Sequence, residues 1–459
     1  IDKARSLAPD LPIVHRPVLN EEHGATAVMG RQLAPGQPDC VYDGIVGLWY
    51  GKAPGLDRAG DALRHAVFTG TSRHGGAVAI VGDDPAAKSS TLPSSSDAAL
   101  VDLLMPILYP GDVKEILTLG MHAVALSRIT GAWTALKVVA AVADGSGTVD
   151  LSSSVVQPKV PDLTIDGVPY LHQPDANLLT PNNLDLERDL RTSRAELVRR
   201  YVVANELNPT TVNPPDAWIG IISRGFTYHQ VIHALDALGL KSHHEIASAG
   251  IRLLHLQLPI PFDPQNIRTF ANGLDEIIVV EEKNPTAEWL VKDALYGSAH
   301  QPRVLGKNHP DGRTLMPSHG ILDANAMLEG LHERLSQKIS GRLQPPQQQK
   351  QIKNLLPLKV QRSPYFCSGC PHNTSTKVPD DSLIGAGIGC HTMVLLMDDD
   401  RVGDISGVTA MGNEGMQWIG MEPFVDRKHF IQNIGDGTYF HSGQLTIPSA
   451  VSAGSNITF

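Results

Sequence analysis

Apolar and polar positions along the chain follow two periods, which predict strands and helices in alternation. The clearest strand is the continuous apolar run Ala77–Val81, which leads into the turn sequence GDDP. A short apolar run that enters such a loop is typical of a buried parallel strand. The longer apolar segment "HAVALSRITGAWTALKVVAAVADG", which starts at His122, is interrupted by Arg128 and Lys137. We interpret this segment as a soluble helix and not as a membrane span.

A second group of apolar runs lies between residues 215 and 340. The runs Trp218–Ile222, Ile251–Leu256 and Ile277–Val280 predict three buried strands. Helical patterns separate them, so the order is β-α-β-α-β. This order predicts a doubly wound parallel sheet and therefore an α/β fold class.

Local signals mark the ends of the helices in this region. Thr227 and Gln230 have the spacing of a helix-start capping pair, and Gly239 is placed to supply a left-handed cap at the helix end. Asp263 followed by Pro264 predicts the start of the next helix. The strand that ends at Val280 is followed by two acids, Glu281 and Glu282, which we expect to be solvated, as strand-end acids usually are.

Changes in composition divide the chain into domains and connections. A Pro- and Asn-rich stretch contains one charged helical pattern, Asp185–Ala204, and a Gln/Pro-rich stretch begins near Leu343. Both stretches are typical of connections between domains. The predicted organisation is a first domain at 1–150, an extended connection at 151–214, the βαβ domain at 215–340, a linker at 341–358 and a last domain at 359–459.

Charge and the first residue restrict the partners and the compartment. The formal net charge of -10 disfavours nucleic-acid binding, because phosphate backbones are held by surplus Lys and Arg. The chain begins with Ile1, without an initiator Met or a signal-peptide layout. We therefore expect a processed or incomplete N-terminus, a cytoplasmic protein, and no membrane or nucleic-acid partner.

Three of the four cysteines form a compact pattern near the C-terminus. Cys367 and Cys370 are separated by two residues, and Cys390 follows after nineteen more. Two thiolates at this spacing can bind one metal centre, and a third can come from a later loop. A zinc site completed by His372 or His391 and an iron–sulfur cluster both fit the spacing. Glycines on both sides of the cysteines favour the cluster modestly.

The tripeptide Gly435-Asp436-Gly437 follows an apolar strand that is expected to end at Ile434. A carboxylate between two glycines at the end of a strand suits Mg²⁺ bound to a diphosphate, because the glycines let backbone N–H groups approach the phosphates. The pattern Leu445–Ala453 predicts a helix that starts late because of its proline. Without further context, a surface turn is the commoner explanation of the tripeptide.

Several longer motifs resemble a known family. They are "VLNEEHGATAVMG", "DGIVGLWYGKAPGLDRAGDALRHA", "FCSGCPHNTSTKVPDDSLIGAGIGCHTM", "MGNEGMQWIGMEPF" and "NIGDGTYFHSGQLTI". The chain resembles the fused bacterial form of indolepyruvate:ferredoxin oxidoreductase, one of the thiamine-diphosphate-dependent 2-oxoacid:ferredoxin oxidoreductases. The resemblance runs from one end of the chain to the other. It implies several doubly wound parallel-sheet domains of thiamine-diphosphate-binding type.

The resemblance implies roles for particular residues. Asp436 would be a magnesium ligand, with Gly435 and Gly437 beside the diphosphate of the cofactor. Glu21 would hydrogen-bond the pyrimidine ring of the cofactor; without the resemblance, a solvated helix-start carboxylate is the preferred interpretation. Cys367, Cys370 and Cys390 would be three of the four ligands of a four-iron, four-sulfur cluster.

The resemblance also implies the reaction and the domain roles. Oxidative decarboxylation of an aryl 2-oxoacid would form an acyl-coenzyme A and pass electrons through the cluster to ferredoxin. Residues 1–150 would bind the pyrimidine ring and 359–459 the diphosphate, whereas 215–340 would be a transketolase C-terminal-like docking domain without a reactive site. We expect a homo-oligomer. There are two alternatives. One is a non-redox thiamine-diphosphate decarboxylase or carboligase with zinc at the cysteines, and the other is a catalytically inert fragment.

The chain also departs from the family pattern. Asn413 stands where a glycine is expected in "MGNEG". The Asn-containing loop that completes the magnesium site and the fourth cysteine would lie beyond Phe459, and an N-terminal Gly-rich loop would precede Ile1. The sequence is therefore expected to be an internal piece of a longer enzyme.

Overall fold

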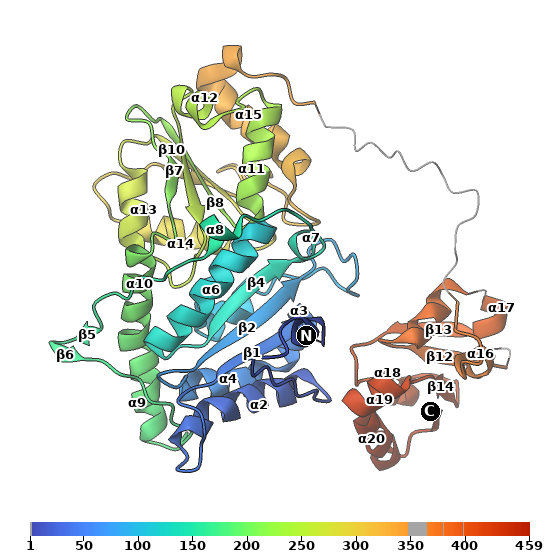
Figure 1. The fold of residues 1–459 in the computed structure, drawn as a ribbon. Helices are drawn as coiled ribbons and strands as arrows, with labels where there is room; N and C mark the ends of the chain where they lie inside the picture. The colour runs from blue at the N-terminus through green and yellow to red at the C-terminus, as the bar shows by residue number, and fades with distance from the viewer. Residues whose placement is uncertain (1, 348–364, 380, 398) are drawn as a thin grey trace. The chain divides into compact units, whose positions relative to one another are not determined.

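The computed structural model describes residues 2–347, 365–379, 381–397 and 399–459. Figure 1 shows the chain as a ribbon. It divides into two compact units, one formed by Glu21–Lys350 and the other by Ile1–Asn20 together with Gln351–Phe459. Among the described residues, the first unit contains two larger sheets and one two-stranded sheet, and the second unit contains one sheet. Much of the linker predicted at 341–358 lies outside the described residues, and the predicted domain roles stay predictions.

The first sheet is parallel throughout and has the strand order β1-β2-β4-β3. Its strand β2 confirms the run predicted at Ala77–Val81. Ala77, Ala79 and Val81 share a core with α2 and α4, whereas Val78 packs with α6 on the opposite face. The elements are β1 (Val46–Lys52), β2 (Gly76–Asp83), β3 (Ile107–Leu108), β4 (Thr134–Val139), α2 (Glu21–Leu33), η1 (Ala34–Gly36), α3 (Ala53–Arg58), α4 (Gly60–Thr69), α5 (Asp97–Asp102), α6 (Val113–Thr130) and α7 (Ala140–Ala143).

The segment that starts at His122 is not one helix, and this prediction was wrong. The helix α6 ends at Thr130, where Gly131 takes a left-handed conformation with φ of 73° and its N–H donates to the Ser127 carbonyl. The strand β4 follows and pairs with β2 and β3, and all six of its residues are buried. A strand buried on both faces is apolar along its whole length, so it lacks the alternation that would have separated it from a helix.

The second sheet has the order β11-β10-β8-β9-β7, with β7 antiparallel to β9 and the other pairs parallel. The three predicted strands are confirmed as β8, β9 and β10. Strand β8 continues through Ser223 and Arg224, two residues beyond the predicted end of the strand. The strands are β7 (Thr210–Val212), β8 (Ile219–Arg224), β9 (Ile251–Leu256), β10 (Glu276–Val280) and β11 (Arg303–Leu305).

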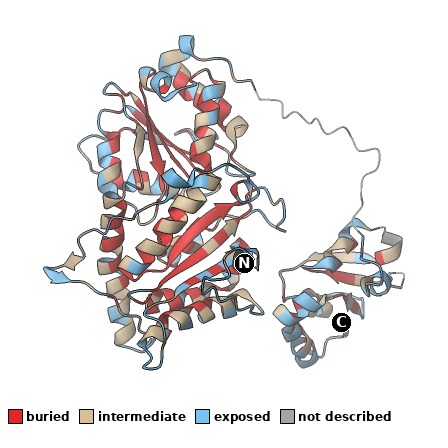
Figure 2. Cartoon of the chain, in the orientation of Figure 1, coloured by how far each residue is buried: buried red, intermediate tan, exposed pale blue. Residues whose placement is uncertain are grey.

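Helices cover both faces of the second sheet, and Figure 2 shows its strands buried between them. Helices α11 and α15 pack on one face, and α13 and α14 on the other. Helix α13 begins at Pro264 as predicted, and Asp263 accepts a hydrogen bond from the Gln265 N–H. The helices are α11 (Phe226–Ala237), α12 (His243–Ser248), α13 (Pro264–Ala271), α14 (Thr286–Leu295), α15 (Ala324–Ile339) and η3 (Ser340–Arg342).

The capping pair predicted at the start of α11 is wrong. The Thr227 hydroxyl donates to the carbonyl of Arg224 at 2.8 Å and lies 3.0 Å from the carbonyl of Val280, so it ties the helix to two strands. The Gln230 side chain accepts from the Ala324 N–H and not from the helix start. At the other end of α11, Gly239 has a φ of 96°, as the predicted left-handed cap requires.

The connection between the two sheets contains the helical pattern predicted at Asp185–Ala204. Three elements form it in succession: α9 (Asn182–Asp189), the π-helical turn η2 (Leu190–Arg194) and α10 (Ala195–Ala204). Helix α10 packs on α6 through Tyr201, whose hydroxyl lies 2.9 Å from His122 Nδ1. The remaining elements of the connection are α8 (Leu151–Ser154) and the small antiparallel pair β5 (Thr164–Ile165) and β6 (Val168–Pro169).

The third sheet lies in the second unit, is parallel, and has the order β13-β12-β14-β15. Strand β14 ends at Gln432, two residues before the predicted end, and α20 confirms the predicted late helix. The elements of this unit are α1 (Asp2–Leu7), α16 (His372–Ser375), β12 (Leu383–Ala386), η4 (Cys390–Leu396), α17 (Asp399–Val402), β13 (Asp404–Val408), α18 (Met416–Met421), η5 (Glu422–Phe424), β14 (Phe430–Gln432), α19 (Asp436–His441), η6 (Gly443–Leu445), α20 (Thr446–Ala453) and β15 (Ile457–Thr458).

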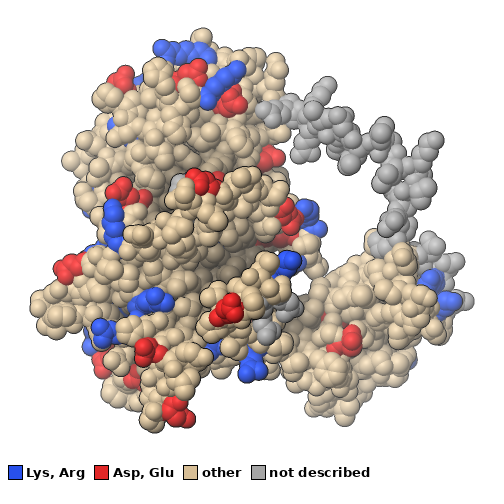
Figure 3. Space-filling model, in the orientation of Figure 1, with Lys and Arg blue, Asp and Glu red and all other residues tan. Residues whose placement is uncertain are grey.

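Charged side chains at the surface are mixed in sign. On the face shown in Figure 3, Lys and Arg are interspersed with Asp and Glu. Among the described residues, none of the helices is both long and apolar enough to cross a membrane.

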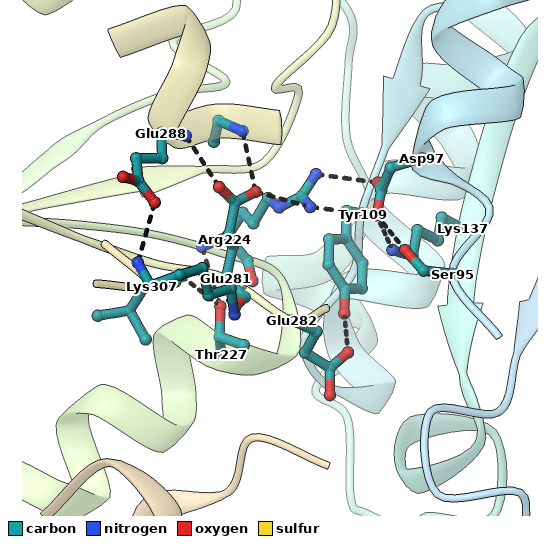
Figure 4. Close-up of polar contacts among 12 residues, drawn as sticks. Ser95, Asp97, Tyr109, Lys137, Arg224, Thr227, Glu281, Glu282, Glu288 and Lys307 are labelled. Carbon is teal, nitrogen blue, oxygen red and sulfur yellow. Dashed lines mark hydrogen bonds and ion pairs between the residues drawn. The ribbon is translucent and has the colours of Figure 1, made fainter. Parts of the chain in front are cut away.

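A set of buried charges joins the first sheet to the second (Figure 4). Arg224, at the end of β8, lies 2.9 Å from Asp97 Oδ1 and 2.9 Å from Glu281 Oε2. Lys137 on β4 approaches the other oxygen of Asp97 to 2.6 Å and the carboxylate of Asp83 to 3.2 Å. All five side chains are buried, so the two sheets share one network of ion pairs.

The expectation that Glu281 and Glu282 are solvated is therefore wrong. Glu282 is buried and accepts a hydrogen bond from the Tyr109 hydroxyl at 3.1 Å, and Glu281 pairs with Arg224. Burial raises the pKa of both carboxyls. The backbone N–H groups of Ala287 and Glu288 also donate to Glu281. The acids after β10 face the neighbouring sheet. The local sequence of one strand cannot show which sheet will pack beside its end.

Candidate functional site

The first cysteine pair lies in a tight loop before α16. The Cys370 N–H donates to the Cys367 carbonyl at 3.0 Å, and the Asn373 side chain donates to the same carbonyl at 3.0 Å. Cys367 is exposed, Cys370 is half-buried, and both are free thiols. The turn therefore leaves two accessible sulfur ligands at the two-residue spacing that metal sites use.

The third cysteine belongs to a second loop that contacts the first. Cys390 is exposed and begins η4, which follows the end of β12. The next residue, His391, has its ring centroid 5.9 Å from that of His372, which is two residues beyond Cys370. This ring contact holds the two cysteine loops beside each other.

The Gly-Asp-Gly turn meets the same loops. It follows β14, and Asp436 is exposed at the start of α19, with Oδ1 accepting from the Gly437 N–H at 2.8 Å. The Thr438 hydroxyl donates to the carbonyl of Ile388, two residues before Cys390, at 2.5 Å. The predicted diphosphate turn and the predicted cluster loops are therefore neighbours at one edge of the third sheet.

His391 lies at the centre of these three segments. Its side chain is fully buried, and neither ring nitrogen has a hydrogen-bond partner among the described residues. Burial, and to a smaller extent the nearby His372, lowers its pKa to about 4, so the ring is neutral at pH 7. A Cβ atom at Gly387 would lie 2.6 Å from His391 Nε2, and one at Gly435 would lie 4.0 Å from Nδ1. Glycine at 387 is what allows the ring to occupy this place.

Glu414 is a second buried polar residue here, and the sequence analysis assigned it no role. Its carboxylate accepts from the Gly412 N–H at 2.7 Å and from the Ile388 N–H at 3.3 Å, and burial raises its pKa. It thereby fixes the glycine-rich loop that leads to Cys390. The only signal in the sequence is its place between two glycines in "MGNEG".

Glu21 lies in the other unit, at the first position of α2. The carbonyl of Glu21 accepts from the indole N–H of Trp49 at 3.0 Å. A Cβ atom at Gly55 would lie 2.7 Å from Glu21 Cγ, so the side chain packs directly on the backbone of α3. The neighbouring Glu22 pairs with Arg58 at 3.1 Å instead. The two acids are therefore distinct, and the role predicted for Glu21 stays a prediction, as do those of the cysteines and of Asp436.

Comparisons with known proteins bear on the family. A family model described as the indolepyruvate oxidoreductase domain matches residues 210–355. The indolepyruvate oxidoreductase subunit IorA of Methanothermobacter thermautotrophicus is 25% identical over 424 residues, which is 89% of this chain. That of Archaeoglobus fulgidus is 26% identical over 416 residues, which is 88% of this chain. The chain is therefore similar to indolepyruvate oxidoreductases over most of its length. It spans 62% and 60% of the lengths of these two relatives.

A solved structure supports the predicted fold of this chain. The 2-oxoglutarate:ferredoxin oxidoreductase from Magnetococcus marinus, with 2-oxoglutarate, coenzyme A and succinyl-CoA bound, aligns with a TM-score of 0.50 at 13% sequence identity. The alignment covers 73% of this chain and 59% of that one. The likeness establishes the α/β fold with several parallel sheets, as the sequence predicted.

Proposed function

We propose that this chain belongs to the indolepyruvate oxidoreductase family and contributes the thiamine-diphosphate and cluster sites of an enzyme that oxidatively decarboxylates an aryl 2-oxoacid. Coenzyme A would accept the acyl group and ferredoxin the electrons. The observation that carries the proposal is the meeting of the two cysteine loops and the Gly-Asp-Gly turn around His391. The names of the curated relatives support the substrate class.

The residues at this edge of the third sheet fit the proposed groups. Three accessible thiols offer soft ligands to iron or zinc, and the exposed Asp436 offers a hard oxygen to Mg²⁺. Mg²⁺ needs about six oxygens, so the diphosphate and water would supply most of the others. Gly387 and Gly435 have no side chains, so their backbone is accessible beside the turn. The two ring nitrogens of His391 have no hydrogen-bond partner among the described residues and are also available there.

Each residue has a separate task in the proposed reaction. When bound, thiamine diphosphate supplies the nucleophilic carbon and the electron sink for decarboxylation, and a cluster supplies a path for single electrons. Glu21 would hold a proton at the pyrimidine ring and orient it, supported by the backbone of α3 at Gly55. Asp436 would anchor the metal of the diphosphate. His391, neutral at pH 7, can exchange hydrogen bonds beside the cysteines without adding a positive charge.

A second candidate function has one observation in its favour. The imidazoles of His372 and His391 lie beside the cysteine loops, and Cys₃His is a common zinc ligand set. Zinc at this site would make the enzyme a non-redox decarboxylase or carboligase. Metal content separates the two candidates.

The experiment is anaerobic purification of the full-length protein with measurement of iron, acid-labile sulfide and zinc. We expect iron and sulfide in equal amounts and a brown absorbance that indolepyruvate with coenzyme A bleaches. Cys390→Ser should lose most of the iron, whereas Cys40→Ser should keep it, because Cys40 is a free cysteine of the other unit. Zinc without sulfide would replace this proposal with the second candidate, and retention of iron by Cys390→Ser would contradict the assignment of the ligands.

A further inference from the structure

A mixed cluster of acids and histidines lies in the unit formed by Glu21–Lys350. Asp112 is the N-cap of α6, Glu115 is in its first turn, and His229 is in the first turns of α11. One ligand atom from each of these three side chains lies within 4.8 Å of the others. The cluster thus connects a helix of the first sheet with a helix of the second.

The distances inside the cluster are close to those of a metal site. His229 Nε2 lies 3.4 Å from Glu115 Oε1 and 3.8 Å from Asp112 Oδ2. Ligand atoms bound tetrahedrally at about 2.0–2.2 Å from zinc lie roughly 3.3–3.6 Å from one another. Small side-chain rotations would therefore bring the three atoms onto one ion.

The backbone already orients the two carboxylates. Asp112 Oδ1 accepts from the Glu115 N–H at 2.8 Å, and Glu115 Oε2 accepts from the Gly111 N–H at 2.7 Å. The other oxygen of each carboxylate faces His229. Gln257 Nε2 approaches Glu115 Oε1 only at 3.4 Å. His229 Nε2 has no hydrogen-bond partner among the described residues, although the atom is buried.

A second histidine points its ring at the same place. His255 is 3% exposed and stacks on Tyr228 with ring centroids 3.9 Å apart, and its Nδ1 lies 3.8 Å from Glu115 Oε1. Its Nε2 has no partner within the described part of the chain. Nδ1 is therefore the nitrogen of His255 that an ion held by Glu115 would reach.

We propose that Asp112, Glu115 and His229 bind one divalent transition-metal ion of the zinc class, with His255 as the nearest further nitrogen donor. Imidazole together with carboxylate suits zinc, manganese or iron, whereas calcium and magnesium prefer oxygen alone. The ion would fasten α6 to α11 across the two sheets. The site involves none of the residues assigned to the proposed reaction. The two proposals are therefore independent, and each can be tested without the other.

The first test compares zinc content in matched variants of the full chain. Protein is loaded with Zn²⁺, desalted and analysed, and the cysteines contribute equally in every variant. We expect His229→Gln and Glu115→Gln to retain about one zinc per chain less than the wild type. His233→Gln, at an exposed histidine of the same helix, should match the wild type. Equal zinc content in all four proteins would overturn the proposal.

The second test needs no variant and keeps the proposal falsifiable if a substitution prevents folding. Wild-type protein is treated with diethylpyrocarbonate with and without Zn²⁺, and modification of each histidine is read by mass spectrometry. We expect Zn²⁺ to slow the modification of His229 at least fivefold and to leave that of His233 unchanged. Equal rates at His229 with and without Zn²⁺ would overturn the proposal.

Discussion

Asp97 and Asp102 lie on the same short helix, α5, and show how strongly the surroundings decide what a side chain does. Asp97 is fully buried between Lys137 and Arg224, whereas Asp102 is exposed and pairs with Arg64 at the surface. Burial alone would raise the pKa of Asp97, but the two cations outweigh it and hold this pKa well below its usual range. The carboxylate is therefore ionised wherever the chain is folded.

Removing the charge of Asp97 should destabilise the protein far more than removing that of Asp102. Asp97→Asn leaves two buried cations short of an anion, and breaking a buried pair costs about 3–5 kcal/mol. Asp102→Asn loses an exposed pair worth about 1 kcal/mol or less. Urea unfolding followed by tryptophan fluorescence measures both variants. Similar losses in the two would show that the network in Figure 4 contributes little to stability.

Residues with a recognisable local pattern could be singled out from the sequence, and the others could not. The cysteine spacing and the tripeptide around Asp436 are local, and the structure brings them together, although their roles stay predictions. His391, Glu414 and Glu281 each contact a segment from a distant part of the sequence. Their burial depends on which loops and sheets meet, and no local pattern records that.

The junction of α6 and β4 shows the same limit at the scale of elements. Strands β8, β9 and β10 were predictable because turns and helical patterns separate their apolar runs. The run from α6 into β4 contains Gly131 but no other break, so helix and strand looked continuous. The capping pair predicted at α11 was wrong because Thr227 and Gln230 bond to neighbouring elements instead.

Gly131→Ala tests how this junction is fixed. Gly131 has a φ of 73°, and a Cβ atom there would lie 2.4 Å from His172 Cβ, so the variant suffers both backbone strain and a clash. We expect a loss of about 2–4 kcal/mol in the free energy of unfolding. Gly273→Ala is the matched control, because its φ is 77° but no atom lies within 4 Å of the added Cβ.

The control should lose only about 1 kcal/mol, the cost of a left-handed alanine. Both variants can be compared by urea unfolding followed by circular dichroism. An equal loss in the two would mean that His172 moves aside and that only the backbone matters at Gly131.

At the scale of the whole molecule, the fold class was predictable and the joining of its parts was not. The βαβ pattern predicted one parallel sheet and the family resemblance implied several, and the structure and the solved neighbour agree. Pairing between sheets is different, because Arg224 and Asp97 are 127 residues apart in the chain. At such a separation in the chain, each charged residue has many possible partners of opposite charge. The sequence alone therefore does not show which two will pair.

The stability of the molecule should fall as pH drops from 7.5 to 5.5, partly because of His122. Burial lowers the pKa of this side chain below 6.5, so the unfolded chain takes up a proton that the folded chain excludes. Its contribution to stability is therefore present above about pH 6.5 and is lost as pH falls. Each such histidine adds at most about 1.4 kcal/mol per pH unit to the slope.

His122→Gln should reduce this slope, since glutamine does not titrate and can still bond to Tyr201. The measurement is the free energy of unfolding at pH 7.5, 6.5 and 5.5. His319→Gln, at an exposed histidine, should leave the slope of the wild type unchanged. An unchanged slope in His122→Gln would show that this ring already takes up its proton in the folded protein.

The ion pairs between the first and second sheets also restrict how such a protein can be recombined. Asp97 on α5 and Lys137 on β4 belong to the part of the chain that forms the first sheet, and Arg224 on β8 and Glu281 after β10 belong to the part that forms the second. A chimaera that takes one of these sheets from a distant homologue would keep the buried charges of the other sheet. Those charges would then lack their counter-ions. Shuffling experiments should therefore move residues 21–347 as one cassette, and related sequences should change these four positions together.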